Sequence, residues 1–341
     1  MVLDKSFVAQ YKNKKVPWGF GALSYITYKR TYSRVKEDGN LEEWYETIER
    51  CINGAQAIGA QYTKEEAEKL FDYMFHLKGT FGGRFLWQLG TKLGSTYGDS
   101  LCNCWSLPIQ KWQDFLFVFH ELLLGGGVGY SVEREYIYQL PTVKRGVTIT
   151  HEQSKDADFI TPDSREGWVK TLEEVLRSFF ETGKSFTYST ILVRGKGEPI
   201  KGFGGVASGG GELVKGIELI TQVLRKREGK KLRSIDVLDI CNIIGSIVVS
   251  GNVRRSAQIA VGNSDDILFL RAKRWDLGNI PNYRSMSNNT ISADTYDYLL
   301  DEFWQGYHGN GEPYGLFNRR LSQTFGRLGE VIQDNCLVPN P

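Results

Sequence analysis

Two cysteines separated by one residue, Cys102 and Cys104, are the side chains of this chain best suited to chemistry. They lie between the turn-forming segment 98–100 and the strand-like segment 105–107. From the alternation of side chains along a strand, we expect only one of the two thiols to face a cavity. A zinc site is not favoured, because no second Cys/Cys or Cys/His pair at ligand spacing accompanies them and the chain has only four histidines. A redox role and a structural role both stay open.

The other cysteines carry weaker signals. The chain has five cysteines, without the regular spacing of a secreted disulfide framework, so reduced thiols are expected. Cys51 and Cys241 follow apolar residues at helical spacing and are interpreted as small core residues. The four histidines are widely separated, and no Ser/His/Asp order indicates a hydrolase.

Glycine-rich loops at 125–129 and 202–211 are the next candidates for chemistry. The first lacks the Lys-Ser/Thr of a P-loop, and neither gives a clean G-x-G-x-x-G between a strand and a helix. Plain tight turns are the simpler interpretation, and a flexible nucleotide-sensing loop is the alternative. Any phosphate would have to be held by helix N-termini and backbone N–H groups.

Composition excludes some classes of protein. The 341 residues carry 42 basic and 40 acidic side chains, so no global field favours nucleic acid or membrane binding. The basic run 225–233 is interpreted as a solvated loop between helices, with phosphate contact as the alternative. No segment has the roughly 18 apolar residues of a membrane span, and the N-terminus lacks a signal-peptide apolar region. We therefore expect a cytoplasmic protein.

The helices and strands that must position these residues fall into two regions. We expect a helical N-terminal region at 1–80 and an α/β region at 81–341. In the first, Trp44, Ile48 and Cys51 form one apolar stripe, and Thr63-x-x-Glu66 is a capping box that opens a second helix. In the second, short apolar runs bounded by glycine alternate with helices. Its expected elements are helices at 114–124 and 235–249, the latter capped by Ser234, and strands at 130–132 and 256–261.

Taken together, these segments resemble, nearly end to end, the N-terminal half of class II, adenosylcobalamin-dependent ribonucleotide reductases, and most closely the monomeric triphosphate reductases among them. The last two residues, Asn340-Pro341, resemble the opening of the Asn-Pro-Cys-Gly-Glu signature that carries the radical cysteine. The other matching segments, in chain order, are 25–32, 83–87, 98–105, 125–132, 163–169, 202–209, 250–257, 287–289 and 311–313.

The resemblance implies a fold and a reaction. The fold is a ten-stranded α/β barrel preceded by helices, of which this chain would hold the first part. In the family, homolysis of the cobalt–carbon bond leads to a thiyl radical that removes hydrogen from C3′ of a ribonucleotide. Water then leaves from C2′, and a pair of cysteines supplies two electrons and becomes a disulfide.

The resemblance also implies roles for individual residues. Cys104 matches the first cysteine of the redox pair, whereas Cys102 stands where the family has asparagine and is treated as a neighbour. Asn340 matches the asparagine that bonds the substrate ribose. A thiol donates hydrogen and electrons, and its disulfide can be reset by thiol exchange. Leu86, Ser100 and Asn103 are expected in substrate binding, and Asp114, Arg134, Lys201, Gly202 and Gly204 in effector binding.

Each effector residue has a structural alternative. Asp114 would cap its own helix, Arg134 would pair with a surface carboxylate, and the glycines would form turns. The stretches 104–125 and 141–156 look shorter than in the triphosphate reductases, which puts effector binding in doubt. The radical cysteine, its glutamate and the second redox cysteine are absent, and Cys336, which precedes Asn340, is not a convincing substitute.

These implications lead to a main hypothesis about function and partners. The chain is expected to be the N-terminal part of a ribonucleoside-triphosphate reductase that needs a C-terminal complement, adenosylcobalamin bound mostly by that complement, a thioredoxin-like reductant and a dNTP effector. A split or intein-interrupted gene would explain the end at Pro341, and a deliberately shortened chain is the alternative. Two other functions stay open, a non-catalytic nucleotide-binding regulator and a reductase that uses a separate radical subunit.

Overall fold

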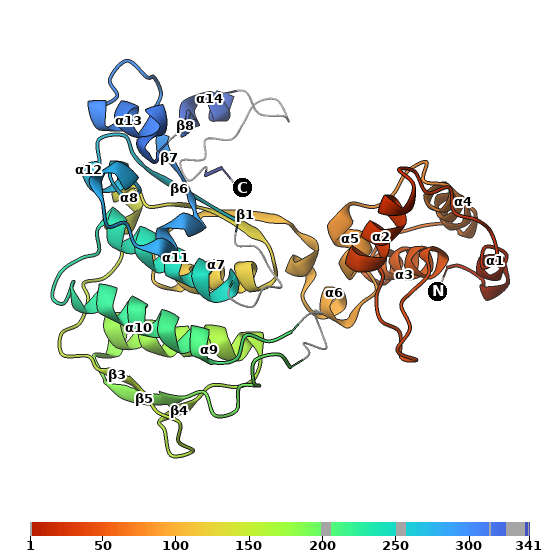
Figure 1. Cartoon of the computed structure of the whole chain (residues 1–341), viewed down its shortest axis with the longest axis horizontal. Helices are drawn as coiled ribbons and strands as arrows, with labels where there is room; N and C mark the ends of the chain where they lie inside the picture. The colour runs from red at the N-terminus through yellow and green to blue at the C-terminus, as the bar shows by residue number, and fades with distance from the viewer. Residues whose placement is uncertain (1, 199–205, 250–256, 314, 325–337, 340) are drawn as a thin grey trace. The chain divides into compact units, whose positions relative to one another are not determined.

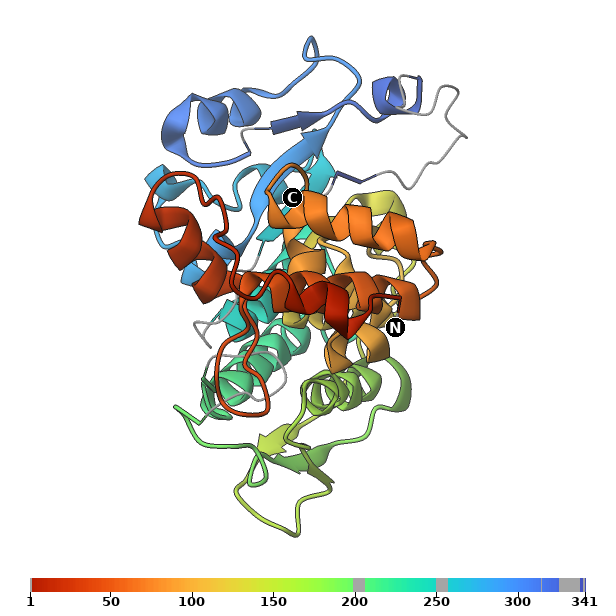
Figure 2. The ribbon, with the colours of Figure 1, turned by 90° about the vertical axis from the view of Figure 1, so that its right-hand side faces the viewer.

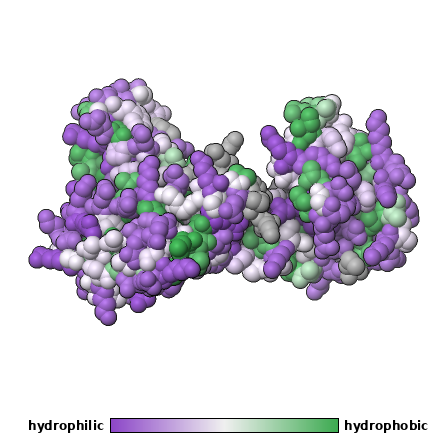
Figure 3. Space-filling model, turned by 60° about the horizontal axis from the view of Figure 1, so that its bottom comes forward, coloured by the Kyte–Doolittle hydropathy of each residue, from purple (hydrophilic) through white to green (hydrophobic). Residues whose placement is uncertain are grey.

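The computed structural model describes residues 2–198, 206–249, 257–313, 315–324, 338, 339 and 341, and it divides into two compact units, Met1–Asn103 and Cys104–Pro341. Each has its own hydrophobic core (Figure 1). Among the described residues, no helix is long and apolar enough to cross a membrane. Figure 3 shows hydrophilic side chains over most of the visible surface of both units, with apolar groups in small patches.

The first unit is helical throughout its regular elements, and Figure 2 turns these helices toward the viewer. Its elements are α1 (Lys5–Ala9), α2 (Ala22–Thr31), α3 (Trp44–Ala57), α4 (Lys64–Phe75), α5 (Gly83–Gln88), α6 (Lys92–Thr96) and the 3₁₀ turn η1 (Gly98–Leu101). The expected stripe of Trp44, Ile48 and Cys51 is confirmed, since all three are buried in the core of this unit. The capping box is also confirmed, because Thr63 accepts from the backbone N–H of Glu66.

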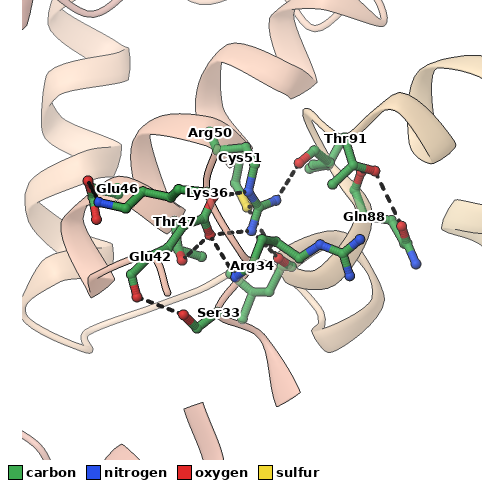
Figure 4. A network of polar contacts seen from close by, with 12 residues as sticks. Ser33, Arg34, Lys36, Glu42, Glu46, Thr47, Arg50, Cys51, Gln88 and Thr91 are labelled. Atoms are coloured by element: carbon green, nitrogen blue, oxygen red, sulfur yellow. Dashed lines mark hydrogen bonds and ion pairs between the residues drawn. The ribbon is translucent and has the colours of Figure 1, made fainter. Parts of the chain in front are cut away.

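A buried ion pair ties α3 to α5 (Figure 4). The Glu42 carboxylate accepts from Arg50 Nε at 2.7 Å and from Thr47 Oγ1 at 2.7 Å, and it is 7% exposed. The same guanidinium donates to the carbonyl oxygens of Leu86 and Leu89, which belong to α5 and its C-terminal cap. The boundary expected at residue 80 therefore falls inside the helical unit, which runs on to Asn103.

The second unit is an α/β structure built on a five-stranded parallel sheet in the order β1-β2-β6-β7-β8. A smaller parallel sheet has the order β3-β5-β4, and α9 and α10 lie between it and the five-stranded sheet (Figure 1). The strands are β1 (Cys104–Pro108), β2 (Gly127–Ser131), β3 (Ile149–His151), β4 (Phe159–Ile160), β5 (Phe186–Ser189), β6 (Ala257–Asn263), β7 (Asn288–Ser292) and β8 (Gly315–Phe317). An α/β fold is thus observed, while a closed ten-stranded barrel is not present in the described residues.

Helices cover one face of the five-stranded sheet. The apolar side chains of α7, α11, β2 and β6, such as Phe119, Ile244, Tyr130 and Ala260, share one core. The helices and helical turns of this unit are α7 (Gln113–Leu123), α8 (Arg134–Ile137), α9 (Arg165–Arg177), η2 (Ser178–Thr182), α10 (Gly211–Arg225), α11 (Ser234–Val249), α12 (Ile267–Leu270), η3 (Trp275–Leu277), η4 (Asn282–Met286), α13 (Asp301–Gln305), η5 (Gly306–Asn310) and α14 (Arg319–Thr324).

The sequence predictions for this unit are confirmed for α7, α11, β2 and β6 within one to three residues. The predicted cap of α11 is wrong. The hydroxyl of Ser234 has no hydrogen-bond partner among the described residues, whereas Asp236 Oδ2 accepts from the backbone N–H of Arg233 at 2.8 Å. The carboxylate of Asp236 thus bonds back to the residue that precedes the helix, as the third helical residue does in a capping box.

Candidate active site on the sheet face that carries Cys104

Cys104 is the first residue of β1, an edge strand of the five-stranded sheet. Its exposed side chain points away from the face that α7 and α11 cover, because the next residue, Trp105, packs on that core. We call the opposite side, which carries Cys104, Ser106, Gly127, Gly129 and Asn288, the Cys104 face. Cys104 and Ser106 are the register partners of Gly127 and Gly129, and Ile259 of β6 lies between Gly129 and Asn288.

Small residues leave room on this face. Gly127 and Gly129 lie beside Cys104 and Ser106 on the adjoining strand β2. The ring of Pro341 occupies the space over Gly127, so a Cβ atom there would lie 2.9 Å from Pro341 Cγ. The Cys104 thiol donates to the carbonyl oxygen of Pro341, with Sγ and O 3.2 Å apart. Two segments separated by 237 residues therefore meet at the thiol.

The two thiols of the Cys102/Cys104 pair are held differently. Cys102 caps the C-terminal end of η1 and precedes the strand, and both side chains are exposed. The expectation that strand alternation separates these thiols was wrong, because residues two apart in a strand share a face. What distinguishes Cys104 is its place on β1 and its contact with Pro341.

Cys51 and Cys241 are confirmed as core residues. Both are fully buried, and burial raises the pKa of the Cys51 thiol to about 12 and that of Cys241 well above its ordinary value. A thiol that holds its proton so firmly is a poor nucleophile and a poor metal ligand. These two cysteines therefore support packing.

The expected substrate residues Leu86, Ser100 and Asn103 lie in the first unit, whereas Cys104 begins the second. Leu86 is part of the helical core and is 6% exposed. Ser100 is buried in η1, and its hydroxyl lacks a partner among the described residues. Asn103 is exposed and accepts a hydrogen bond from Arg84 Nε at 2.8 Å. Their role in substrate binding stays a prediction.

The expected effector residues that the structure describes have local partners. Asp114 Oδ2 accepts from the backbone N–H groups of Gln110 and Lys111 at 2.7 and 2.9 Å, which fixes the turn that leads into α7. Arg134 forms a fork with Asp265, with its shortest contact at 2.6 Å, and that carboxylate is mostly exposed. Arg134 thus pairs with a surface carboxylate, as its structural alternative expected. Asp114 bonds to N–H groups that precede α7 and does not act as the N-cap of that helix. The effector role stays a prediction for both.

Four of the expected residues, Asn340, Lys201, Gly202 and Gly204, lie outside the described residues, as does Cys336.

A pocket that the sequence did not reveal lies at the N-terminus of α9. It offers about 150 Å³ of open space next to residues 206–209, which belong to the second glycine-rich loop. Trp168 lines it, together with Asp163 and Arg194, whose carboxylate and guanidinium are 2.9 Å apart. Ser164 caps α9 by accepting from the backbone N–H of Gly167 at 3.0 Å. In the sequence, segment 163–169 was one of the matches to the family, but nothing in it predicted a pocket.

The geometry therefore defines an α/β protein with an exposed thiol at the start of a parallel edge strand and a second chain segment packed against it. Two family models match the chain: the ribonucleotide reductase alpha domain at residues 3–91, and the insertion domain of B12-dependent ribonucleotide reductase at residues 134–224. The chain belongs to the class II, adenosylcobalamin-dependent ribonucleotide reductases and corresponds to about their N-terminal half.

Individual relatives agree with this assignment. The adenosylcobalamin-dependent ribonucleoside-triphosphate reductase of Lactobacillus delbrueckii subsp. bulgaricus is 35% identical over 97% of this chain and 53% of its own length. The Lactobacillus gasseri reductase of the same name is 34% identical over 98% and 53%. A crystal structure of a B12-dependent (class II) ribonucleotide reductase superimposes with a TM-score of 0.80 at 31% identity, over 96% of this chain and 53% of that one.

The chain thus spans about half the length of the curated relatives it matches. The match to the insertion domain covers α8, the small sheet, α9 and all of α10 except its last residue. The part of the chain that contains the short stretch 141–156 therefore matches the insertion domain, and effector binding stays a prediction. Nothing in these comparisons bears on a split or intein-interrupted gene, which stays a prediction.

Proposed function

We propose that this chain supplies the N-terminal part of a ribonucleoside-triphosphate reductase, and that Cys104 is one of its two reducing thiols. The observation that carries the proposal is the contact between Cys104 Sγ and the carbonyl oxygen of Pro341 at 3.2 Å. In the family signature, the residue after this proline is the radical cysteine. Because consecutive Cα atoms are about 3.8 Å apart, that cysteine would lie beside Cys104 on the same face.

The proposed reaction transfers two electrons and two protons to the ribonucleotide. Two thiols, Cys104 and one on the complement, are oxidised to a disulfide and release two electrons and two protons. The ribonucleotide loses its C2′ hydroxyl as water and gains hydrogen at C2′. The exposed Cys104 thiol already donates a hydrogen bond across the Cys104 face, so it is placed to protonate a departing hydroxyl there. A thioredoxin-like dithiol would reset the disulfide by exchange.

Adenosylcobalamin, when bound, would supply the radical that starts this chemistry. The described residues that adjoin Cys104 on this face are Ser106 and Gly127, followed across the sheet by Gly129, Ala257 and Ile259. None of them is a usual metal ligand. The residues present therefore do not form a cobalamin site by themselves, and we assign its binding mainly to the complement.

A complement is also expected from the fold. The edge strands β1 and β8 have one paired side each within the described sheet. Unpaired strand edges and uncovered sheet faces favour addition of further strands. The C-terminal half of the reductase is the partner that fits both edges.

We also propose that a dNTP effector binds at the α9 pocket beside Trp168. Its support is the position of the pocket, which is lined mostly by residues of the part that matches the insertion domain at 134–224, among them residues 206–209 of the second glycine-rich loop. The helix N-terminus there favours anions. Arg165, the first residue of α9, also lines the pocket. Quenching of Trp168 fluorescence by dNTPs, lost in Arg165→Gln, would support this assignment.

Reconstitution tests the reductase proposal. The 341-residue chain is mixed with the C-terminal half, adenosylcobalamin and a dithiol, and deoxynucleotide formation is measured from ribonucleoside triphosphates and, separately, diphosphates. We expect cobalamin-dependent turnover that Cys104→Ser abolishes and the matched Cys102→Ser control retains. Equal turnover of the Cys104→Ser variant would refute the role of this thiol.

Two other outcomes identify the alternatives. Nucleotide binding without any recoverable turnover would favour a regulatory piece. Turnover that needs no cobalamin would favour a reductase with a separate radical subunit.

A further inference from the structure

Cys102 and Cys104 are both exposed and reduced, and the proposed function uses only Cys104. One residue separates the two thiols, and two residues of backbone span at most about 7 Å. The Cα atoms of a disulfide are usually about 4.4–6.8 Å apart. The covalent chain alone therefore holds the two cysteines near bridging distance.

The backbone next to Cys104 can adjust to such a bridge. Cys104 is fixed in β1 by its pairing with β2, whereas Cys102 and Asn103 belong to no helix or strand. The bonds that hold them are a backbone bond from Cys102 to the carbonyl oxygen of Asp99 and an exposed bond from Arg84 Nε to Asn103 at 2.8 Å. A rotation at Asn103 can therefore bring the Cys102 thiol toward Cys104 while β1 stays paired.

The other described cysteines cannot replace Cys102. Cys51 and Cys241 are fully buried, and burial raises the pKa of both thiols. Thiol–disulfide exchange requires a thiolate that can reach the sulfur under attack. A neighbour in the same chain attacks at a high effective concentration, because it is already beside its target. Among the described thiols, Cys102 is therefore the one placed to attack a disulfide formed on Cys104.

We propose that Cys102 is a resolving thiol, one that displaces a foreign thiol from a mixed disulfide on Cys104. An exposed thiolate reacts with small disulfides such as oxidised glutathione: Cys104 bonds to one glutathione sulfur, and the other glutathione leaves as a thiol. The Cys102 thiolate then attacks Cys104 Sγ, the bond between Cys102 and Cys104 forms, and the second glutathione leaves. The two protein thiols lose two electrons and two protons, which reduce the glutathione disulfide. A dithiol reverses the change by exchange.

Mass spectrometry of the 341-residue chain after treatment with oxidised glutathione tests the proposal. Every protein carries Cys336→Ser, because Cys336 lies outside the described residues. We expect this parent chain to lose two hydrogen atoms and to show a bond between Cys102 and Cys104 on peptide mapping. The added substitution Cys102→Ser should leave at least tenfold more glutathione on Cys104, because no neighbouring thiol displaces it.

Ser106 provides a control with the same spacing. When Cys102→Ser is combined with Ser106→Cys, two thiols are again two residues apart, but both belong to β1. A paired strand rises about 3.3 Å per residue, so their parallel side chains stay too far apart for the roughly 3.5–4.5 Å between Cβ atoms of a disulfide. We expect this variant to keep its glutathione. A parent chain that keeps glutathione on Cys104 as firmly as this control would overturn the proposal.

The value of this reaction for turnover rests on the proposed function, whereas the exchange is measured on the chain alone. Bridging in the parent chain without turnover in the reconstituted enzyme would refute the reductase role and support the resolving role. Turnover that depends on Cys104 without bridging would do the reverse. Cys102→Ser still retains turnover under reducing conditions, because excess dithiol removes any mixed disulfide from Cys104.

Discussion

The substitution Gly127→Ala should disable the reaction without disturbing the fold. The new Cβ atom would lie 2.9 Å from Pro341 Cγ and 3.4 Å from Ala257 Cβ. Carbon atoms at optimal contact are about 3.5–4.0 Å apart, so Pro341 would have to move by roughly 0.6–1 Å. That shift acts on the segment to which the Cys104 thiol donates its hydrogen bond. Because misplacement by about 1 Å can cost 10²-fold in rate, turnover of the reconstituted enzyme should fall up to about a hundredfold.

Two measurements separate this effect from unfolding. Gly127 does not have a positive φ, so alanine is compatible with its backbone, and the urea midpoint should change little. In a background with Cys102 and Cys336 changed to serine, alkylation of Cys104 should become faster once the Pro341 contact is displaced. Gly98→Ala is the control, because nothing lies within 4 Å of its added Cβ. Wild-type turnover in Gly127→Ala would refute the idea that Pro341 must sit beside Cys104.

Local features of the fold were predictable from the sequence because they depend on neighbours in the chain. The apolar stripe of α3 and the Thr63/Glu66 capping box follow from helical spacing, and both are confirmed. Ser234 was misassigned because the helix begins one residue earlier: the backbone N–H groups of Asp236 and Val237 donate to the carbonyl oxygen of Arg233, which therefore stands at the N-cap. The Asp236 side chain bonds back to the N–H of Arg233, as the third helical residue does in a capping box. Sequence spacing alone does not decide between two neighbouring start positions.

The order of the strands was not predictable from spacing, because pairing joins segments far apart. The β2 and β6 strands are neighbours, although the whole insertion domain lies between them. The boundary at Asn103 likewise depends on Arg50, whose guanidinium ties α5 to the helical core through carbonyl groups that any residue could supply. Backbone acceptors leave no trace in the sequence.

The candidate site was predictable in part. Cys104 was selected by its resemblance to the family, and the structure adds its contact with Pro341. The α9 pocket was missed, because it is built from side chains on separate segments, such as Asp163 and Arg194. Such sites carry no spacing signal, and only the packing of the insertion domain brings their members together.

Three further substitutions test ion pairs and core packing in the two units. Glu42→Ala leaves a buried guanidinium without its carboxylate and should lower the free energy of unfolding by about 3–5 kcal/mol; Asp265→Ala, which breaks a mostly exposed pair, should cost at most about 1 kcal/mol in the same urea titration. Gly216→Ala would place a Cβ atom 2.3 Å from both Cδ1 and Cγ1 of Ile247 and should cost about 1–3 kcal/mol, with partial rescue by Ile247→Ala, which removes both atoms, in the double variant. His151 should make the protein sensitive to mild acid, because burial lowers its pKa below the ordinary value of 6.5. His151 takes up a proton near pH 6.5 in the unfolded chain but only at lower pH in the folded chain. The contribution of His151 to the free energy of unfolding is therefore complete above pH 6.5 and is lost as the pH falls through the folded pKa. Urea midpoints measured from pH 7.5 down to about pH 5 should therefore fall more in the wild type than in His151→Gln, and parallel curves for the two proteins would show that the imidazole titrates as it does in the unfolded chain.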